Sequence, residues 1–175
     1  MAIIPSNGNG RGISGSVRVL VVEDHEPFRR FLCSTLEKRP ELQIVCEVSD
    51  GRDAVRKAGD LHPDLILLDV GLPTLNGIEA ARQIRKLSHK SKILFVSQES
   101  SADVVQEAFR IGALGYVAKA HAGSDLLPAV EAVCQGERFV SAGLAGQVPA
   151  DFADHQAPNR LHPDQILAPQ PEAED

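Results

Sequence analysis

The sequence predicts an α/β protein in which helices cover both faces of a doubly wound, five-stranded parallel sheet. The first observation behind this prediction is that five short apolar segments, typical of buried strands, alternate with five segments whose apolar residues recur at helical spacing. The second is that polar or charged residues directly follow four of the five apolar segments. Because ligands bind at the carboxyl edge of such sheets, the same pattern locates a candidate site.

The strand expected at residues 65–69 is the clearest of the five. Four apolar residues in a row suit a strand that is buried on both faces, and Asp69 ends the run where the strand must reach the surface. Gly71 and Pro73 then turn the chain. Asp69 therefore has the position of a reactive group rather than of a surface charge.

The other elements follow from apolar runs and from helix start and stop signals. Strands are expected at residues 17–22, 42–48, 93–96 and 114–117. Helices are expected from Pro27 to before Pro40, from Asp50 to Gly59, from Asn76 onward, from Ser101 or Ala102 to Gly112, and from Ser124 to about Gln135.

Three regions differ in composition. Residues 1–16 are rich in Gly, Ser and Asn and are expected to be a flexible leader. Residues 17–141 hold the α/β domain. Residues 142–175 contain five prolines, many acidic residues and no lysine, so this tail is expected to be largely disordered.

Charge and cysteine content narrow the class of protein. The net charge of −6 gives no electrostatic footprint for nucleic acid, so direct nucleic-acid binding is not expected. The three cysteines, Cys33, Cys46 and Cys134, lie far apart in apolar surroundings, as reduced thiols of a cytosolic protein do. No apolar stretch has the length of a membrane span or the form of a signal peptide, so we expect a soluble cytoplasmic protein without membrane contact.

Polar side chains gather at the predicted carboxyl edge of the sheet. Glu23 and Asp24 follow the first strand, and Asp69 follows the third. Three carboxylates repel one another unless a cation lies between them, and oxygen ligands suit Mg²⁺. Ser97 and Lys119 follow the fourth and fifth strands and offer a hydroxyl and an ammonium to the remaining oxygens of a phosphoryl group. The set predicts a site at which Asp69 accepts phosphate with Mg²⁺ as cofactor.

These motifs, taken in order, resemble the receiver domain of two-component response regulators, which has a flavodoxin-like fold. The order is Glu23-Asp24, then Leu67-Leu68-Asp69-x-x-Leu72-Pro73-x-x-x-Gly77, then Ser97, then Tyr116-x-x-Lys119. The resemblance implies that a histidine kinase or phosphotransfer protein phosphorylates Asp69. It also implies that the backbone carbonyl of Gly71 joins the carboxylates as a Mg²⁺ ligand, and that Ser97 and Tyr116 move as switch residues. Alone, Asp24 would be taken as a helix cap and Tyr116 as a core residue.

Three residues depart from the commonest receiver pattern. Gln98 stands where a small residue is frequent, and Glu99 lies at a position that varies and tunes the hydrolysis rate in receivers of this kind. Ala120 replaces the frequent proline after the lysine. Since none of these changes removes a reacting group, they bear on acyl-phosphate lifetime and kinetics.

Two other classes use related features. A haloacid-dehalogenase-type phosphatase also has a strand-end Asp with Mg²⁺, but it needs a second Asp two residues on, where this chain has Gly71. A flavodoxin-like or nucleotide-binding module needs a phosphate loop after the first strand, where this chain has the anionic run 23–26. We therefore expect a phosphoacceptor signalling domain and not an enzyme.

The resemblance leaves the output open. The region of the fifth helix resembles the subfamily that usually continues into a LuxR-type helix-turn-helix domain, for which this chain is too short. We expect a stand-alone receiver that signals through its fourth and fifth helices and its fifth strand. An unknown output partner, phosphorelay transfer, homodimerisation through that face and action independent of phosphorylation all remain open.

Overall fold

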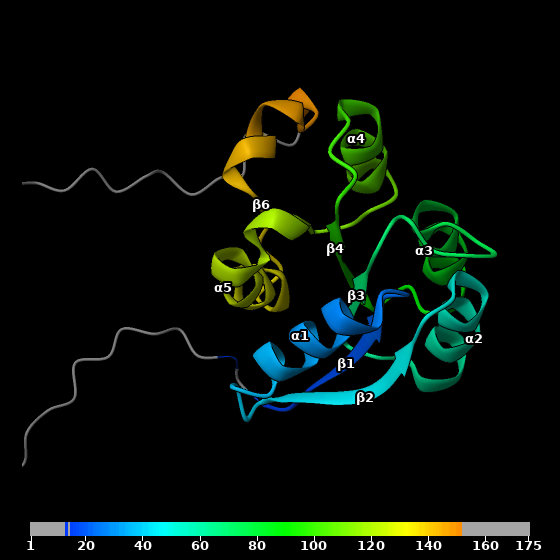
Figure 1. Ribbon diagram of the computed structural model, residues 1–175. Coiled ribbons are helices and arrows are strands. Elements are labelled where there is room, and N and C mark those ends of the chain that lie inside the picture. Colours follow the sequence, from blue (N-terminus) through cyan, green and yellow to red (C-terminus); the bar gives the residue numbers. More distant parts are fainter. Residues whose placement is uncertain (1–12, 14, 152–175) are drawn as a thin grey trace, which may run out of the picture.

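Six parallel strands form a single sheet at the centre of the computed structural model, which describes residue 13 and residues 15–151 (Figure 1). The strands are β1 (Val17–Val22), β2 (Leu42–Val48), β3 (Leu65–Leu68), β4 (Lys92–Ser97), β5 (Gly115–Ala118) and β6 (Phe139–Val140). Their order across the sheet is β2-β1-β3-β4-β5-β6. The doubly wound parallel topology is confirmed, but the number of strands is six rather than five. β6 was missed because two residues are too few to show a strand period.

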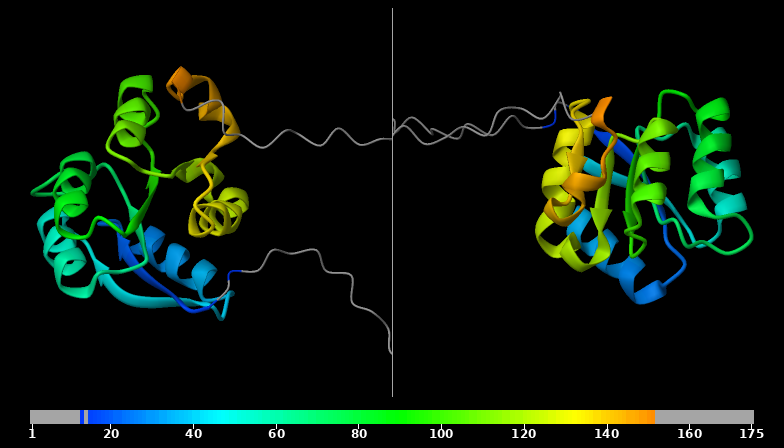
Figure 2. Two further views of the ribbon diagram at one scale, coloured as in Figure 1. Left: turned by 180° about the vertical axis from the view of Figure 1, so that it is seen from behind. Right: turned by 90° about the horizontal axis from the view of Figure 1, so that it is seen from above.

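Helices cover both faces of the sheet, as Figure 2 shows from two further sides. They are α1 (Glu26–Leu36), α2 (Gly51–Leu61), α3 (Gly77–Leu87), α4 (Ala102–Arg110) and α5 (Ala122–Cys134), with short 3₁₀ helices η1 (Lys119–His121) and η2 (Ala142–Gln147). α1 and α5 pack on one face, and α2, α3 and α4 pack on the other. For α1 to α4 this division follows from right-handed crossovers, because the chain moves from β1 to β2 in one direction across the sheet and from β2 through β5 in the other. α5 lies on the α1 face although the step from β5 to β6 continues in the second direction.

The two cores use alternate residues of the same strands. In β3, Leu65 and Leu67 face the α1–α5 side, whereas Ile66 and Leu68 face the α2–α4 side, and all four are fully buried. Because both faces are covered, the central strands are apolar throughout instead of alternating. For this reason the central strands appear in the sequence as uninterrupted apolar runs.

Two of the predicted helix starts are capped by side chains. The Asp50 carboxylate accepts hydrogen bonds from the backbone N–H of Arg52 and Asp53 at the start of α2, at 2.7 and 3.1 Å. Asn76 accepts one from Glu79 at the start of α3, at 3.0 Å. These caps satisfy backbone donors that helices otherwise leave open.

The start of α5 differs from the prediction. The helix begins at Ala122, two residues before the expected cap Ser124, because the 3₁₀ turn of η1 leads directly into it. Pro128 lies inside the helix.

The segment after Ser141 also differs from the prediction in its first residues. The expected disordered tail was placed from residue 142, yet Ala142–Gln147 forms η2, which packs beside α4. Leu144 anchors it with a side chain that is only 4% exposed. Residues 1–12, 14 and 152–175 lie outside the described residues, and so do most of the expected leader and tail. None of the helices in the described part of the chain has the length and apolar character that crossing a bilayer requires.

Gly77 brings the start of α3 against the backbone of Asp69. A Cβ atom at this position would lie 1.9 Å from the Asp69 carbonyl oxygen. We therefore expect Gly77→Ala to lower the free energy of unfolding by about 2 kcal/mol, because backbone must move to admit the methyl group. Urea denaturation measures the change. Gly123→Ala is the matched control, since a Cβ there meets nothing within 4 Å; equal losses in the two variants would contradict the prediction.

Candidate functional site

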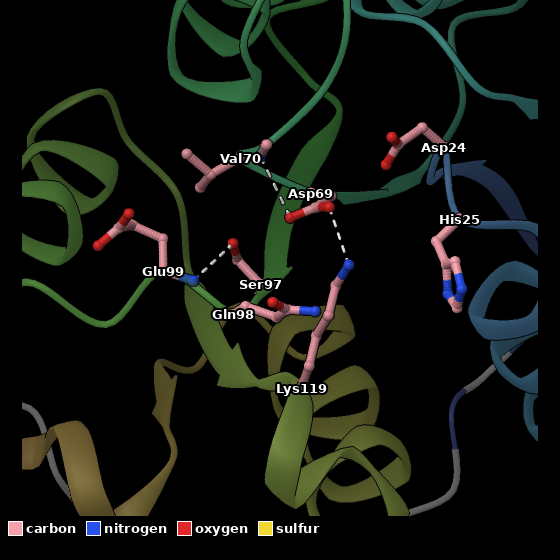
Figure 3. Close-up of a pocket in the computed structure, with 9 residues that line it drawn as sticks. Asp24, His25, Asp69, Val70, Ser97, Gln98, Glu99 and Lys119 are labelled. Atoms are coloured by element: carbon pink, nitrogen blue, oxygen red, sulfur yellow. Dashed lines mark hydrogen bonds and ion pairs between the residues drawn. The ribbon is translucent and has the colours of Figure 1, made fainter.

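The carboxyl edge of the sheet forms a cavity of about 400 Å³ (Figure 3). The loops after β1, β3, β4 and β5 all contribute to its wall. The lining residues are Asp24, His25, Asp69, Val70, Gly71, Ser97, Gln98, Glu99 and Lys119. Of the predicted site residues, Asp24, Asp69, Gly71, Ser97 and Lys119 line this cavity.

Three carboxylates converge on one side of the cavity. Glu23, Asp24 and Asp69 each offer an oxygen, and these three oxygens lie within 4.8 Å of one another. Glu23 is fully buried, Asp69 is 5% exposed and Asp24 is exposed to solvent. A hard divalent cation fits such a set, because it binds a few carboxylates and retains waters on its open side.

Lys119 supplies the nearest positive charge. Its Nζ lies 2.8 Å from Glu23 Oε2 and 2.9 Å from Asp69 Oδ2. The same Nζ lies 4.8 Å from the centre of the Phe28 ring, within the range of a cation–π contact. Burial lowers the pKa of Lys119, but its bonds to Glu23 and Asp69 outweigh burial and leave that pKa above its ordinary value. Lys119 therefore stays charged between the two carboxylates.

Glu23 is held by several contacts, and one of its carboxylate oxygens is buried without a hydrogen bond. Its backbone N–H donates to Val48 O at 3.1 Å, and its Oε1 accepts the backbone N–H of His25 at 3.0 Å. Oε2 is buried and has the Lys119 ion pair but no hydrogen bond of good geometry. Burial raises the pKa of this carboxyl group, which the Lys119 contact partly offsets. A buried carboxylate with an unsatisfied oxygen, close to the carboxylates of Asp24 and Asp69, fits the expected Mg²⁺.

Each oxygen of the Asp69 carboxylate accepts a hydrogen bond from a different residue. Oδ2 accepts from Lys119, and Oδ1 accepts the backbone N–H of Gly71 at 3.3 Å. In Figure 3 Asp24 and Lys119 lie to one side of the Asp69 side chain, and Ser97 lies on the other side. This arrangement leaves the carboxylate facing the cavity, where a phosphorus atom could be attacked.

Ser97 and Tyr116 are joined through the backbone of Glu99. Ser97 is 2% exposed, and its Oγ accepts the Glu99 N–H at 3.2 Å. The Tyr116 hydroxyl donates to the Glu99 carbonyl at 2.6 Å, and its ring stacks on Phe95 with centroids 5.8 Å apart. Tyr116 is fully buried and does not line the cavity. The two expected switch residues thus hold the same loop, between β4 and α4.

The two unusual loop residues lie at the cavity wall. Figure 3 shows the Gln98 side chain between Ser97 and Lys119, below Asp69. The Glu99 carboxylate is turned away from Asp69 and accepts the Ser101 N–H at 3.2 Å. Gln98 is therefore placed to restrict the cavity.

Sequence reasoning missed several residues that touch this site. Arg29 Nη1 donates to the Glu23 carbonyl at 2.8 Å, and Phe28 lies beside Lys119. Ser141 is fully buried; its Oγ accepts the Ala118 N–H at 3.1 Å, next to Lys119 in the chain. Phe28 was visible only as part of an apolar helical stripe. Arg29 and Ser141 carried no signal, because their contacts join segments that are distant in sequence or lie across a turn.

The fold and the site are those of a signalling domain that is found in two-component systems. The model of the response regulator receiver domain matches residues 19–131, and the chain belongs to this family. Phosphorylation and Mg²⁺ binding are general features of the family.

Individual relatives are LuxR-family response regulators. The chain is 35% identical over 132 residues to the transcriptional regulatory protein LiaR of Bacillus subtilis, covering 75% of this chain and 63% of LiaR. It is 31% identical over 139 residues to the nitrate/nitrite response regulator protein NarL of Escherichia coli, covering 79% of this chain and 64% of NarL. A crystal structure of a LuxR-family two-component response regulator from Aurantimonas sp. SI85-9A1 matches with a TM-score of 0.72 and 31% identity. It covers 80% of this chain and 97% of that chain.

The matches cover less than two thirds of LiaR and NarL. The activities of those whole proteins are therefore not assigned to this chain by similarity alone.

The buried phenol of Tyr116 gives a direct test of its inward position. Burial raises the pKa of Tyr116 to about 12, and since it is the only tyrosine, phenolate absorbance reports on it alone. Because the pKa is raised on folding, the phenol stays neutral in the native protein through pH 10 and ionises near pH 12 or when the fold opens. A spectrophotometric titration at 295 nm measures this, with the urea-unfolded protein, expected to titrate near pH ~10, as control. A native midpoint equal to the unfolded one would contradict the buried position.

Proposed function

We propose that this chain is a two-component phosphoacceptor in which Asp69 takes the phosphoryl group from a phosphohistidine. The donor would be a histidine kinase or a phosphotransfer protein. The observation that carries the proposal is the position of the Asp69 carboxylate in an open cavity. This carboxylate lies 2.9 Å from Lys119 Nζ, and one of its oxygens lies within 4.8 Å of an oxygen of Glu23 and an oxygen of Asp24. The family match supports the same assignment.

The chemistry needs one bond to form and one to break. An Asp69 Oδ atom attacks phosphorus, an acyl phosphate forms, and the phosphorus–nitrogen bond to the donor imidazole breaks. Lys119 stabilises the negative charge on the phosphoryl oxygens, and the Ser97 hydroxyl can donate to one of them. Glu23, Asp24, Asp69 and the Gly71 carbonyl would hold Mg²⁺, which neutralises further charge on the phosphoryl group when bound.

A second cavity supports the approach of a donor protein from the α1 side. It measures about 370 Å³ and is lined by Pro27, Phe28 and Phe31 together with three residues at the edge of the first cavity, His25, Gln98 and Lys119. An aromatic surface beside a reactive carboxylate suits a protein partner better than a small metabolite.

Output through the α4-β5-α5 face is the second part of the proposal. Ser97 and Tyr116 hold the loop that leads into α4, so a change at Asp69 can alter this loop. β6 pairs with β5, and η2 packs beside α4, so the surface of this face includes the exit segment as well. Homodimerisation, regulation of another protein and phosphorelay transfer are the possible uses. Stand-alone action without a DNA-binding domain, a cytoplasmic location and the phosphorylation-independent alternative stay predictions.

Replacement of the proposed phosphoacceptor gives the first test. We expect the wild type to gain one phosphoryl group, seen by intact mass, on incubation with Mg²⁺ and acetyl phosphate. Asp69→Asn should gain none, because an amide cannot form the acyl phosphate. Asp103→Asn is the control, since this exposed carboxylate on α4 lies outside the cavity. Stable labelling of Asp69→Asn would refute the assignment of Asp69.

The proposed metal site gives a separate test. We expect Asp24→Ala to weaken Mg²⁺ binding at least about tenfold, measured by isothermal titration calorimetry, because it removes a ligand and not merely a supporting group. The stability of the metal-free variant should not fall, since one of three crowded negative charges is gone. Asp103→Ala should bind Mg²⁺ as the wild type does. An unchanged Mg²⁺ affinity in Asp24→Ala would contradict this site.

A further inference from the structure

We propose that Arg29 is a positioning residue for the metal ligands Glu23 and Asp24. This inference rests on the proposed function, because it concerns the Mg²⁺ site of the phosphoacceptor. Arg29 lies on α1, and its Nη1 donates a hydrogen bond of 2.8 Å to the Glu23 carbonyl oxygen. Its Nε lies 3.6 Å from Glu47 Oε1 on β2, and the Arg29 side chain is 21% exposed.

The Glu23 carbonyl belongs to the peptide that joins the two ligand residues. Rotation of this peptide about its flanking bonds would move the carboxylate of Asp24 relative to that of Glu23. The chain leaves β1 at Val22 and enters α1 at Glu26, so this peptide lies in neither element. Arg29 therefore supplies, from the first turns of α1, the hydrogen bond that a regular strand or helix would have supplied.

The remaining contacts of Glu23 show why this bond matters. The N–H of Glu23 is held by Val48 O, and Oε1 is held by the N–H of His25. With Arg29 on the carbonyl, the backbone on both sides of the Glu23 side chain is held. Arg29 makes these contacts with the backbone and with Glu47, and not with the carboxylates that face the cavity. It can thus order the metal ligands without occupying the place of a cation among them.

Arg30 provides a natural control. It follows Arg29 directly, carries the same charge, and has a side chain that is 78% exposed. Its partner is Glu26, one helical turn earlier on the surface of α1. A general effect of positive charge near the site would appear in both arginines, whereas a positioning role belongs to Arg29 alone.

A competing interpretation is that Arg29 only ties α1 to β2 through Glu47. That contact is long, at 3.6 Å, and the Glu47 side chain is 49% exposed, so its contribution to stability is small. Glu47→Gln separates the two interpretations, because it weakens the ion pair and leaves the bond from Arg29 to the Glu23 carbonyl in place.

The experiment measures Mg²⁺ affinity and stability side by side. Isothermal titration calorimetry with MgCl₂ compares the wild type, Arg29→Gln, Arg29→Lys, Arg30→Gln, Glu47→Gln and Asp24→Ala, and urea denaturation in EDTA gives the stability of each metal-free protein. We expect Arg29→Gln to raise the Kd for Mg²⁺ about tenfold or more. Arg30→Gln and Glu47→Gln should bind Mg²⁺ as the wild type does. Arg29→Lys should lie between, because an ammonium can donate to one acceptor but lacks the planar fork.

The rate of phosphorylation by acetyl phosphate gives a second readout. If Arg29 only positions the ligands, Arg29→Gln should need more Mg²⁺ for half-maximal rate but should reach nearly the wild-type maximum at saturating Mg²⁺. A variant whose only defect is low stability would lose rate in proportion at every Mg²⁺ concentration. If Arg29→Gln does not fold, Arg29→Lys carries the comparison.

The outcomes separate this inference from the proposed function. If the wild type binds Mg²⁺, Asp24→Ala does not, and Arg29→Gln binds as tightly as the wild type, the role of Arg29 is overturned while the metal site stands. An equal loss of affinity in Glu47→Gln would assign the effect to the contact between α1 and β2 and would also overturn it. If the wild type itself binds no Mg²⁺, the proposed site fails, and the role of Arg29 fails with it.

Discussion

The shared ammonium of Lys119 is the contact on which the arrangement of the site depends. Two largely buried carboxylates, Glu23 and Asp69, lie on the same Nζ at 2.8 and 2.9 Å. Two carboxylates that share one ammonium repel each other unless that cation lies between them, and burial adds to that cost. Lys119 thus holds the carboxyl ends of β1, β3 and β5 together. The cation–π contact with Phe28 and the backbone bonds at Glu23 keep this arrangement in place.

A second set of contacts runs from the cavity to the outer edge of the sheet. The side chains of Ser97 and Tyr116 both bind the backbone of Glu99. The backbone carbonyl of Tyr116 accepts the N–H of Ser141 at 3.1 Å. The Ser141 hydroxyl accepts from Ala118 and donates to Asp125 of α5 at 2.6 Å. β5 is therefore hydrogen-bonded to the segment that leads into η2. These bonds fix the backbone of β5, so a movement of the Tyr116 side chain has to break only its hydroxyl bond to the Glu99 carbonyl.

The sequence was sufficient for the parts of the fold that depend on local pattern. The apolar runs of the central strands and the helix starts at Asp50 and Asn76 lie where they were predicted. Asp24, Asp69, Ser97 and Lys119, which follow or end different strands, line one cavity. What could not be predicted depends on contacts between distant segments. β6 forms because two residues pair with β5, and η2 forms because Leu144 packs into the core beside α4. The hydrogen bond from Arg29 to the Glu23 carbonyl forms because α1 packs back against the end of β1. None of these leaves a period or a motif in the sequence.

The groups around the Asp69 carboxylate differ from those that a phosphatase of the haloacid-dehalogenase type requires. Such a phosphatase needs a second Asp two residues after the nucleophile. Here Gly71 occupies that position and directs its N–H to Asp69 Oδ1. Glu99, the other carboxylate in the cavity wall, is turned toward Ser101, while Glu23 and Asp24 belong to the candidate cation site. In the described part of the chain, the carboxylates around the cavity are thus engaged with Lys119, with Ser101 or with one another, and the residue two positions after Asp69 offers that carboxylate only a backbone N–H.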